Sequence, residues 1–432
     1  MFSMGNASAD LAIASAVPTD AELRECPSCG QFQSVPPLLP GAVARCLQCN
    51  RVLRRVRADP VATPLALSFG ALVLFVIACT MTLMDVSTLG LQHQANLLTG
   101  PVGLSSNGLW ELGLVVLFTS VLAPLTKLLR LLYVLTRLVL PGTPPRHLRA
   151  VFAWVERISP WSMVEVYLVG TFVAYVKLID IVQIRIGVAL WALVGTMLLM
   201  VAIDALLDPD AVWEEMHRRG IHRTSGRWYA PSTATIACTV CGLVGSARDK
   251  HCLRCDAPLH RRKPNSVNRA WALLITASVL YIPANVYPVL TIIQGGSGQP
   301  STILGGVEEL ITSGMYPLAA VVFLASIAVP MLKIIGLALL LIWTQTRRLS
   351  RLRDRTRLYR IVEVIGRWSM IDIFMESILV ALVQFGGLIT IDPGVGAVAF
   401  CAVVILTMLA ANCFDPRLMW DAAAERTREI MS

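Results

Sequence analysis

Long apolar runs alternate with short polar segments along most of this chain. Each run is long enough to cross about 30 Å of hydrocarbon as a helix. The pattern predicts eight such spans, at residues 61–84, 109–132, 164–184, 187–207, 267–293, 316–343, 371–391 and 395–414. The third and fourth spans are separated only by a short turn around Arg185, and the seventh and eighth by one at Asp392-Pro393. Each of these pairs is therefore predicted to form a helical hairpin.

Composition supports a bilayer rather than water as the solvent of this chain. Hydrophobic residues make up 55% of the 432 positions and charged residues 15%, whereas soluble proteins carry roughly 25% charge. The mean hydropathy is +0.65, which argues against a soluble enzyme. The net charge of +9 comes from basic blocks beside apolar runs, so the expected partner of these blocks is the membrane surface and not nucleic acid.

The arginines predict the orientation of the chain, because short cytoplasmic loops collect Lys and Arg. The segment 130–157 holds five arginines and the segment 347–367 holds eight, whereas the loops 85–108 and 294–309 hold no Lys or Arg. Residues 1–25 lack the pattern of a signal peptide, since Asp10 and Asp20 flank a weak apolar patch. We therefore expect both termini in the cytoplasm.

The chain repeats itself at an offset near 207 residues. Ser120 to Lys127 recurs at Ser326 to Lys333, Trp161-Ser162-Met163 recurs at Trp368-Ser369-Met370, and Asp208-Pro209 recurs at Asp415-Pro416. An even number of spans gives both copies the same orientation. The predicted fold is an all-α polytopic membrane protein of two parallel four-helix repeats, each preceded by a small cytoplasmic zinc-ribbon-like module. The predicted divisions are a tail 1–25, a module 26–57, a repeat 61–207, a linker 208–237, a module 238–262, a repeat 267–414 and a tail 415–432.

Eight of the eleven cysteines fall in four CxxC pairs, two before each repeat. The pairs are Cys26/Cys29, Cys46/Cys49, Cys238/Cys241 and Cys252/Cys255. Two such pairs complete the four-sulfur shell that structural zinc prefers, so two structural zinc ions are expected. Iron in a rubredoxin-like site and redox chemistry remain alternatives, although a reducing cytosol disfavours disulfides. His251 or His260 could also replace a ligand in the second module.

Two lysines lie in matching settings of the two repeats. Lys127 follows Pro124 and Lys333 follows Pro330, and each proline should disturb its helix by removing an N–H donor. Both lysines lie near the inner interface, where such side chains can extend to water. A transport role and a purely structural one are both open for this pair.

Four further ionisable residues are predicted inside the membrane. Lys177 and Asp180 lie one helical turn apart on the third span, and Asp372 and Glu376 one turn apart on the seventh. Ionisable groups at this depth are candidates for function, here a proton relay or a headgroup contact. A buried polar network without function, and for Asp372 a helix-capping role, are the alternatives.

These motifs together resemble the PqiA/LetA (paraquat-inducible protein A) family. The resemblance rests on the CxxC modules, the Pro-x-x-Lys and Trp-Ser-Met segments, Val176-Lys177-Leu178 and Pro283-Ala284-Asn285. It implies a bacterial inner-membrane partner of a periplasmic MCE-domain protein, whose tunnel carries lipids between membranes. The first span has no equivalent of Pro283-Ala284-Asn285, so a lipid pocket is expected in the second half, and Asn285 joins the candidate residues.

Three functions follow from these considerations. The first is a non-enzymatic subunit that moves phospholipid between the inner membrane and the partner's tunnel. The second is a scaffold whose zinc modules recruit partners, and the third is a redox enzyme, suggested only by the family's name. All six histidines lie outside the predicted spans and no P-loop motif occurs, which excludes bis-histidine haem in the membrane and ATP use through a P-loop.

Overall fold

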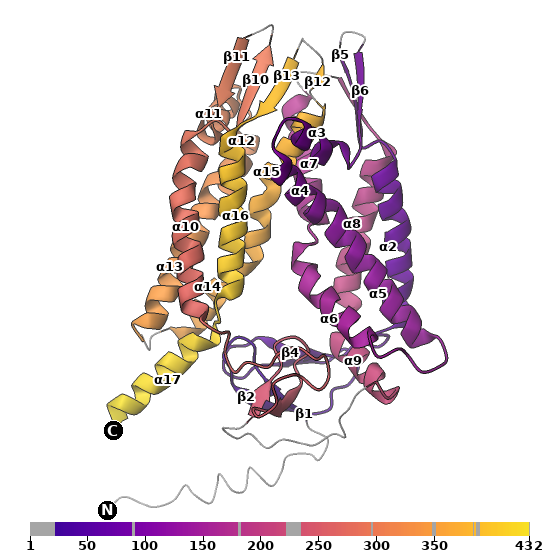
Figure 1. The fold of residues 1–432 in the computed structure, drawn as a ribbon, viewed down its shortest axis with the longest axis vertical. Coiled ribbons are helices and arrows are strands. Elements are labelled where there is room, and N and C mark those ends of the chain that lie inside the picture. Colours follow the sequence, from indigo (N-terminus) through magenta and orange to yellow (C-terminus); the bar gives the residue numbers. More distant parts are fainter. Residues whose placement is uncertain are drawn as a thin grey trace, which may run out of the picture.

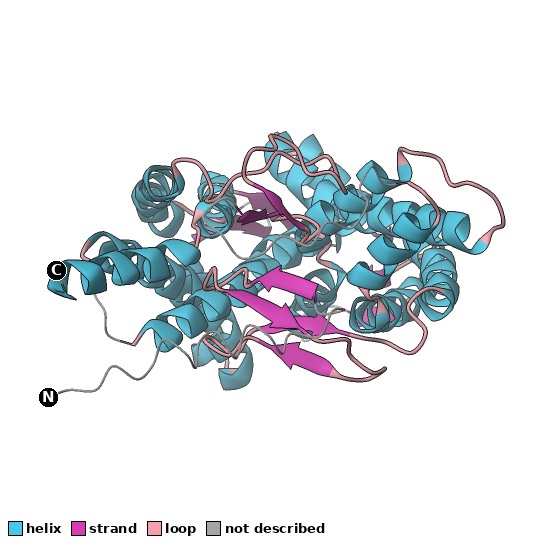
Figure 2. Ribbon diagram, turned by 90° about the horizontal axis from the view of Figure 1, so that it is seen from below, coloured by secondary structure: helices cyan, strands magenta, loops and turns pink. Residues whose placement is uncertain are grey.

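The computed structural model is mostly helical, with short strands at both ends of the molecule (Figures 1 and 2). It describes residues 22–88, 91–179, 183–221, 235–294, 297–347, 351–382, 384–385 and 389–431. Within these residues, seven helical segments are long and apolar enough to cross a membrane. They are Ala62–Thr80, Trp110–Val139, Leu148–Leu178, Val188–Leu206, Ser266–Val286, Tyr316–Gln345 and Val395–Cys413.

The helices form two halves with the same order of elements. The helices of the first half are α2 (Ala62–Thr80), α3 (Thr99–Ser106), α4 (Trp110–Leu117), α5 (Ala123–Val139), α6 (Leu148–Ile158), α7 (Val164–Leu178), α8 (Val188–Leu206) and α9 (Pro209–Arg218). Those of the second half are α10 (Ser266–Val286), α11 (Ile303–Thr312), α12 (Tyr316–Phe323), α13 (Val329–Gln345), α14 (Leu352–Ile365), α15 (Ile371–Leu382), α16 (Val395–Cys413) and α17 (Arg417–Met431). Within each half the first and last long helices pack together, α2 with α8 and α10 with α16.

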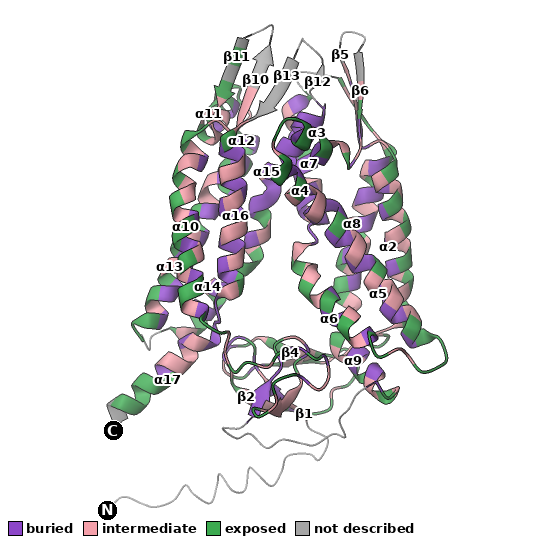
Figure 3. Ribbon diagram, in the orientation of Figure 1, coloured by how far each residue is buried: buried purple, intermediate pink, exposed green. Residues whose placement is uncertain are grey.

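The seventh predicted span is shorter than expected. Residues 371–391 were predicted to cross the bilayer, but α15 ends at Leu382, and short strands follow it in the described part of the chain. At about 1.5 Å per residue, neither the 12 residues of α15 nor the 15 of its counterpart α7 span about 30 Å alone. Each follows an earlier helix, α14 or α6, after a short 3-10 segment. Nearly the whole of α15 is buried against protein (Figure 3).

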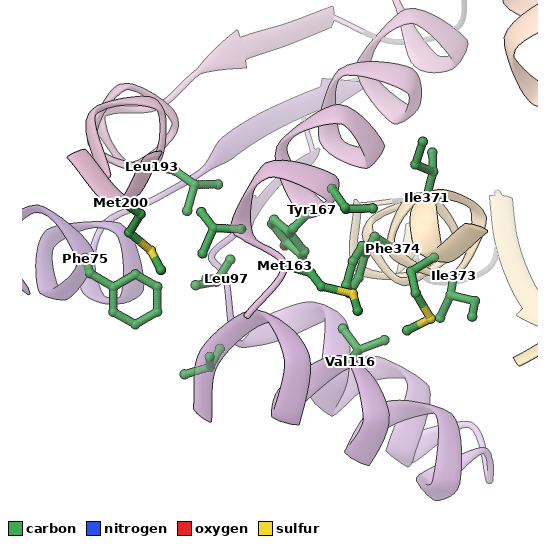
Figure 4. Close-up of a cluster of buried hydrophobic side chains, with 14 of the residues drawn as sticks. Phe75, Leu97, Val116, Met163, Tyr167, Leu193, Met200, Ile371, Ile373 and Phe374 are labelled. Carbon is green, nitrogen blue, oxygen red and sulfur yellow. The ribbon is translucent and has the colours of Figure 1, made fainter. Parts of the chain in front are cut away.

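Helix α15 joins the two halves. It belongs to the second half but packs against α7, α3 and α4 of the first. The Phe374 ring meets the Tyr167 ring edge-on at a centroid distance of 5.4 Å (Figure 4). Gly170 allows this approach, because a Cβ atom there would lie 2.9 Å from Cβ of Phe374.

Antiparallel sheets, which the all-α prediction did not include, cover the end of the helices opposite the cysteine modules (Figure 1). In the first half the order is β6-β5-β7, formed by β5 (Met84–Thr88), β6 (Leu91–Ala95) and β7 (Gln183–Ile186). In the second it is β11-β10-β13-β12, formed by β10 (Leu290–Gln294), β11 (Ser297–Ser301), β12 (Gln384–Phe385) and β13 (Ile389–Pro393).

The two predicted hairpin turns are therefore strands that pair with distant segments. Arg185 lies opposite Asp85 and Asp392 lies opposite Thr291 in the register. Gly187 and Gly394 follow these strands at equivalent positions of the two halves, and a Cβ atom at either would overlap a backbone oxygen, Thr82 O at 2.0 Å or Pro288 O at 2.2 Å.

A π-helical segment precedes each proline of the Pro-x-x-Lys motifs. Segment η1 covers Phe118–Leu122 and η3 covers Leu324–Ala328. In a π-helical turn each backbone hydrogen bond spans five residues instead of four. This change of register accommodates Pro124 and Pro330, which have no N–H to donate. The predicted disturbance of both helices thus takes the form of a π-helix in each half.

Candidate functional site

The eight paired cysteines form two compact clusters, one in each module. Within each cluster the four sulfur atoms lie within 4.8 Å of one another and all four residues are buried. Sγ of Cys26 lies 3.4 Å from Sγ of Cys49, and Sγ of Cys238 lies 3.5 Å from Sγ of Cys255. Tetrahedral zinc with bonds of about 2.3 Å requires sulfur separations of about 3.8 Å, so both clusters have the size of a four-sulfur metal shell.

The same backbone turn presents each CxxC pair. The N–H four residues after the first cysteine donates to the carbonyl of that cysteine, as Gly30 does to Cys26 at 2.8 Å. The donating residue has positive φ in all four turns, and these residues are Gly30, Asn50, Gly242 and Asp256. Gly, Asn and Asp tolerate this conformation best. Their place after each CxxC is a sequence signal of the cluster that the CxxC spacing alone does not contain.

Short antiparallel strands flank three of the four CxxC turns. In the first module β1 (Glu22–Glu25) pairs with β2 (Phe32–Val35) and β3 (Val43–Arg45) with β4 (Val52–Arg55). In the second, β8 (Thr235–Ala237) pairs with β9 (Val244–Ser246). The His251 ring lies 3.2 Å from the carbonyl oxygen of Asp256, and the described four-sulfur shell does not include it.

Each module contacts both halves, and its cysteine cluster lies against the half that the module does not precede in the sequence. Arg24 of the first module pairs with Asp210 of α9 at 2.8 Å, and Arg262 of the second pairs with Asp421 of α17 at 2.6 Å. The first cluster contacts Trp420 of α17, and Arg360 of α14 donates to the carbonyl of Cys49 at 3.3 Å. The second cluster belongs instead to the large hydrophobic cluster that contains Trp213 of α9 and Phe152 of α6. Figure 1 shows the modules between α9 and α17, beneath the two halves.

A pocket of about 320 Å³ lies between the halves, toward the end that carries the strands β5 to β7 and β10 to β13. We call it the inter-half pocket. Most of its wall comes from the second half, and Lys177 and Leu178 at the end of α7 complete it. Its apolar wall includes Ile303, Leu310, Met315, Val322, Met375, Leu379 and Phe400.

Three carboxylates face this pocket together with one amine. Asp372 and Glu376 lie one turn apart on α15, Glu309 lies on α11, and all three interact electrostatically with Lys177. One carboxylate oxygen each of Asp372 and Glu376 is buried without a hydrogen-bond partner among the described residues. Buried charge without a partner is costly, so a cation, a proton or a polar donor at these two oxygens would stabilise the group.

The structure separates the other predicted polar residues from this group. Lys127 pairs with Asp204 of α8 at 2.7 Å. Lys333 is 1% exposed, and its amine has no hydrogen-bond partner among the described residues. Ala411 stands where the repeat would place the aspartate equivalent to Asp204, which explains why Lys333 lacks that pairing.

Two more predicted residues lie outside the pocket or outside the described chain. The Asn285 side chain donates to the Tyr281 carbonyl of its own helix at 2.8 Å, and Asn285 does not line the pocket. Asp180 lies outside the described residues. No sequence signal singles out Glu309 or Asp204, because Glu309 falls in a predicted outer loop and nothing in the sequence relates Asp204 to Lys127.

Comparisons with known proteins agree with these features. The family model of paraquat-inducible protein A (PqiA) matches residues 61–217 and 267–424. The chain is 34% identical to "Intermembrane transport protein PqiA" of Escherichia coli strain K12, covering 94% of this chain and 97% of that protein. It is 32% identical to "Lipophilic envelope-spanning tunnel protein A" of the same strain, covering 93% and 92%.

A more distant relative comes from Haemophilus influenzae, where a "Probable intermembrane transport protein" is 26% identical over 92% of this chain. No solved structure matches the chain. The apolar helices and these relatives together make it a membrane protein. The chain belongs to the paraquat-inducible protein A (PqiA) family.

Proposed function

We propose that this chain moves phospholipid between the bacterial inner membrane and the tunnel of a periplasmic MCE-domain partner. The inter-half pocket carries the proposal, since it combines an apolar wall with a cluster of charged groups. Ligand sites commonly have this composition. Relatives named as intermembrane transport proteins support a transport role, and no enzymatic step is proposed.

The proposed orientation puts both termini and both cysteine modules in the cytoplasm. The arginine-rich segment 347–367 lies toward the module end, where Arg353 and Arg360 donate to carbonyls of the first module. Arginines concentrate in cytoplasmic loops. The strands and the inter-half pocket then lie toward the periplasm, where a tunnel protein could receive lipid.

The two clusters are proposed to hold structural zinc. Four buried sulfurs at 3.4 to 3.6 Å along their closest pairs suit a closed tetrahedral shell. A bound ion would fix the turns and so the contacts between the modules and the helices. This role is structural, and the proposal assigns no reaction to the metal.

The transport proposal is tested by filling the pocket. Ile303 lines the pocket, whereas its neighbour Leu304 is 59% exposed. Ile303→Trp should reduce the phospholipid that co-purifies with the protein and its transfer to a reconstituted MCE-domain partner, while Leu304→Trp should leave both unchanged. Equal effects of the two substitutions at equal abundance would contradict the proposal.

A further inference from the structure

The charged groups of the inter-half pocket are unbalanced. Glu309, Asp372 and Glu376 bring three carboxylates to its wall, and Lys177 is the one Lys or Arg among its lining residues. All three carboxylates act electrostatically on the Lys177 amine. If the groups are ionised, the wall carries an excess of two negative charges, which favours a cationic group on the ligand.

Two of these carboxylates have unused hydrogen-bonding capacity. Oδ2 of Asp372 and Oε1 of Glu376 are buried and unpartnered among the described residues. Glu376 is 3% exposed, so bulk water does not solvate its carboxylate. A primary ammonium has three donors, and these could be shared among the carboxylates on α15 and Glu309.

The same wall also carries donors for an anionic group. The Lys177 amine lies at the end of α7, and Thr302, whose hydroxyl oxygen accepts from the Gly305 N–H, also lines the pocket. An amine and a hydroxyl are donors suited to a phosphate. The pocket therefore presents anionic groups for an amine, cationic and hydroxyl groups for a phosphate, and an apolar wall for acyl chains.

We infer that the inter-half pocket selects phospholipids whose headgroup carries a primary ammonium, the phosphatidylethanolamine type, over anionic phospholipids. The inference rests on the proposed function, because it assumes that the pocket holds lipid. A phosphatidylglycerol headgroup supplies no cation, and its extra net negative charge meets the carboxylate excess. The discriminating groups are Glu309, Asp372 and Glu376.

The test places the full chain in nanodiscs that contain equal amounts of phosphatidylethanolamine and phosphatidylglycerol. Native mass spectrometry of the released protein then gives the ratio of the two bound lipids. The unaltered chain should hold phosphatidylethanolamine in excess, by up to about fivefold for a contact equal to one exposed ion pair.

The decisive variant reverses one charge at the pocket. Glu309→Lys leaves two carboxylates against two amines and should shift the bound ratio toward phosphatidylglycerol. Glu308→Lys is the matched control, since Glu308 and Glu309 are both exposed on the same helix and only Glu309 lines the pocket. Glu308→Lys makes the same change in net charge, and its ratio of bound lipids should equal that of the unaltered chain.

The outcomes separate this inference from the proposed function. Headgroup selection is overturned if the bound lipids have the same ratio as the nanodisc lipids, or if the two lysine variants shift that ratio equally. In either case, displacement of bound lipid by Ile303→Trp would still support the proposed transport. If no bound lipid responds to Ile303→Trp, both proposals fail. A ratio that shifts in Glu309→Lys alone supports both.

Discussion

Glu25 and Arg417 form a buried ion pair, with Oε1 and Nη1 3.0 Å apart, although 392 positions separate them in the sequence. Glu25 ends β1 of the first module and Arg417 begins α17, so the pair ties the start of the described chain to its last helix. Arg262 also binds Glu25, at 3.1 Å. Burial raises the pKa of the Glu25 carboxyl, and the two guanidinium groups oppose that rise.

Removal of the Glu25 charge should destabilise the junction of the modules and the second half. Glu25→Gln removes one charged partner from each of two guanidinium groups, while Arg417 keeps Asp415 and Arg262 keeps Asp421. The loss of hydrogen bonds to a charged group should therefore cost about 1.5 kcal/mol. We expect a lower thermal unfolding midpoint for the purified protein. Glu22→Gln is the control, because the Glu22 side chain is 34% exposed and should have a smaller effect. Equal midpoints for the two variants would show that the pair does not stabilise the junction.

Metal analysis should find two zinc ions per chain, one in each module. Cys26→Ser should remove one ion, because the remaining sulfurs no longer complete the shell. Cys79→Ser should remove none, since Cys79 lies on α2 outside both clusters. Elemental analysis of the purified proteins gives the counts. Two ions in the Cys26→Ser protein, or iron in place of zinc, would contradict the assignment.

Chelation should loosen the contacts between the halves as well as the modules, because each module contacts both halves. The first cluster contacts Trp420 and Arg360 of the second half. Limited proteolysis after treatment with a chelator should therefore cleave near both clusters and within α17. The same protein supplied again with zinc should regain its resistance. Cleavage confined to the modules would show that they do not brace the helices.

Gly170 should be sensitive to the smallest added side chain. A Cβ atom there lies 2.9 Å from Cβ of Phe374 and 3.1 Å from the Ile371 carbonyl oxygen, so Gly170→Ala forces α7 and α15 apart. Overpacking of this kind costs about 1–3 kcal/mol. Gly70→Ala is the matched control in α2, where the new Cβ atom would meet Leu199 at an ordinary 3.5 Å. Thermal unfolding of both variants, together with their abundance in the membrane, checks the difference.

Charge at the inter-half pocket should be needed for function and not for abundance. Lys177→Ala and Glu376→Gln should abolish transport of phospholipid at an unchanged protein level. Glu308→Gln is the control, because Glu308 is exposed on α11 and does not line the pocket. Immunoblotting and a lipid-transfer assay measure the two quantities. Loss of function that merely follows loss of protein would favour the scaffold hypothesis.

For some residues of the candidate site the sequence alone predicts that they lie close together, and for others it does not. Asp372 and Glu376 are one turn apart on a single helix, so helical spacing alone places them on one face. Lys177 joins them from α7 only because α15 packs across the boundary between the halves. Glu309 joins from a helix that the hydrophobic pattern predicted as an outer loop.

The sequence by itself determined the membrane character, the duplicated order of helices and the pairing of cysteines within each module. These properties depend on local composition and spacing, which apolar runs and CxxC motifs record directly. Only the tertiary structure decided that α15 is buried against the first half, because protein-buried and lipid-facing helices are equally apolar. It also decided the crossed packing of the cysteine clusters and the charge excess of the pocket, because those contacts join residues that no local pattern relates.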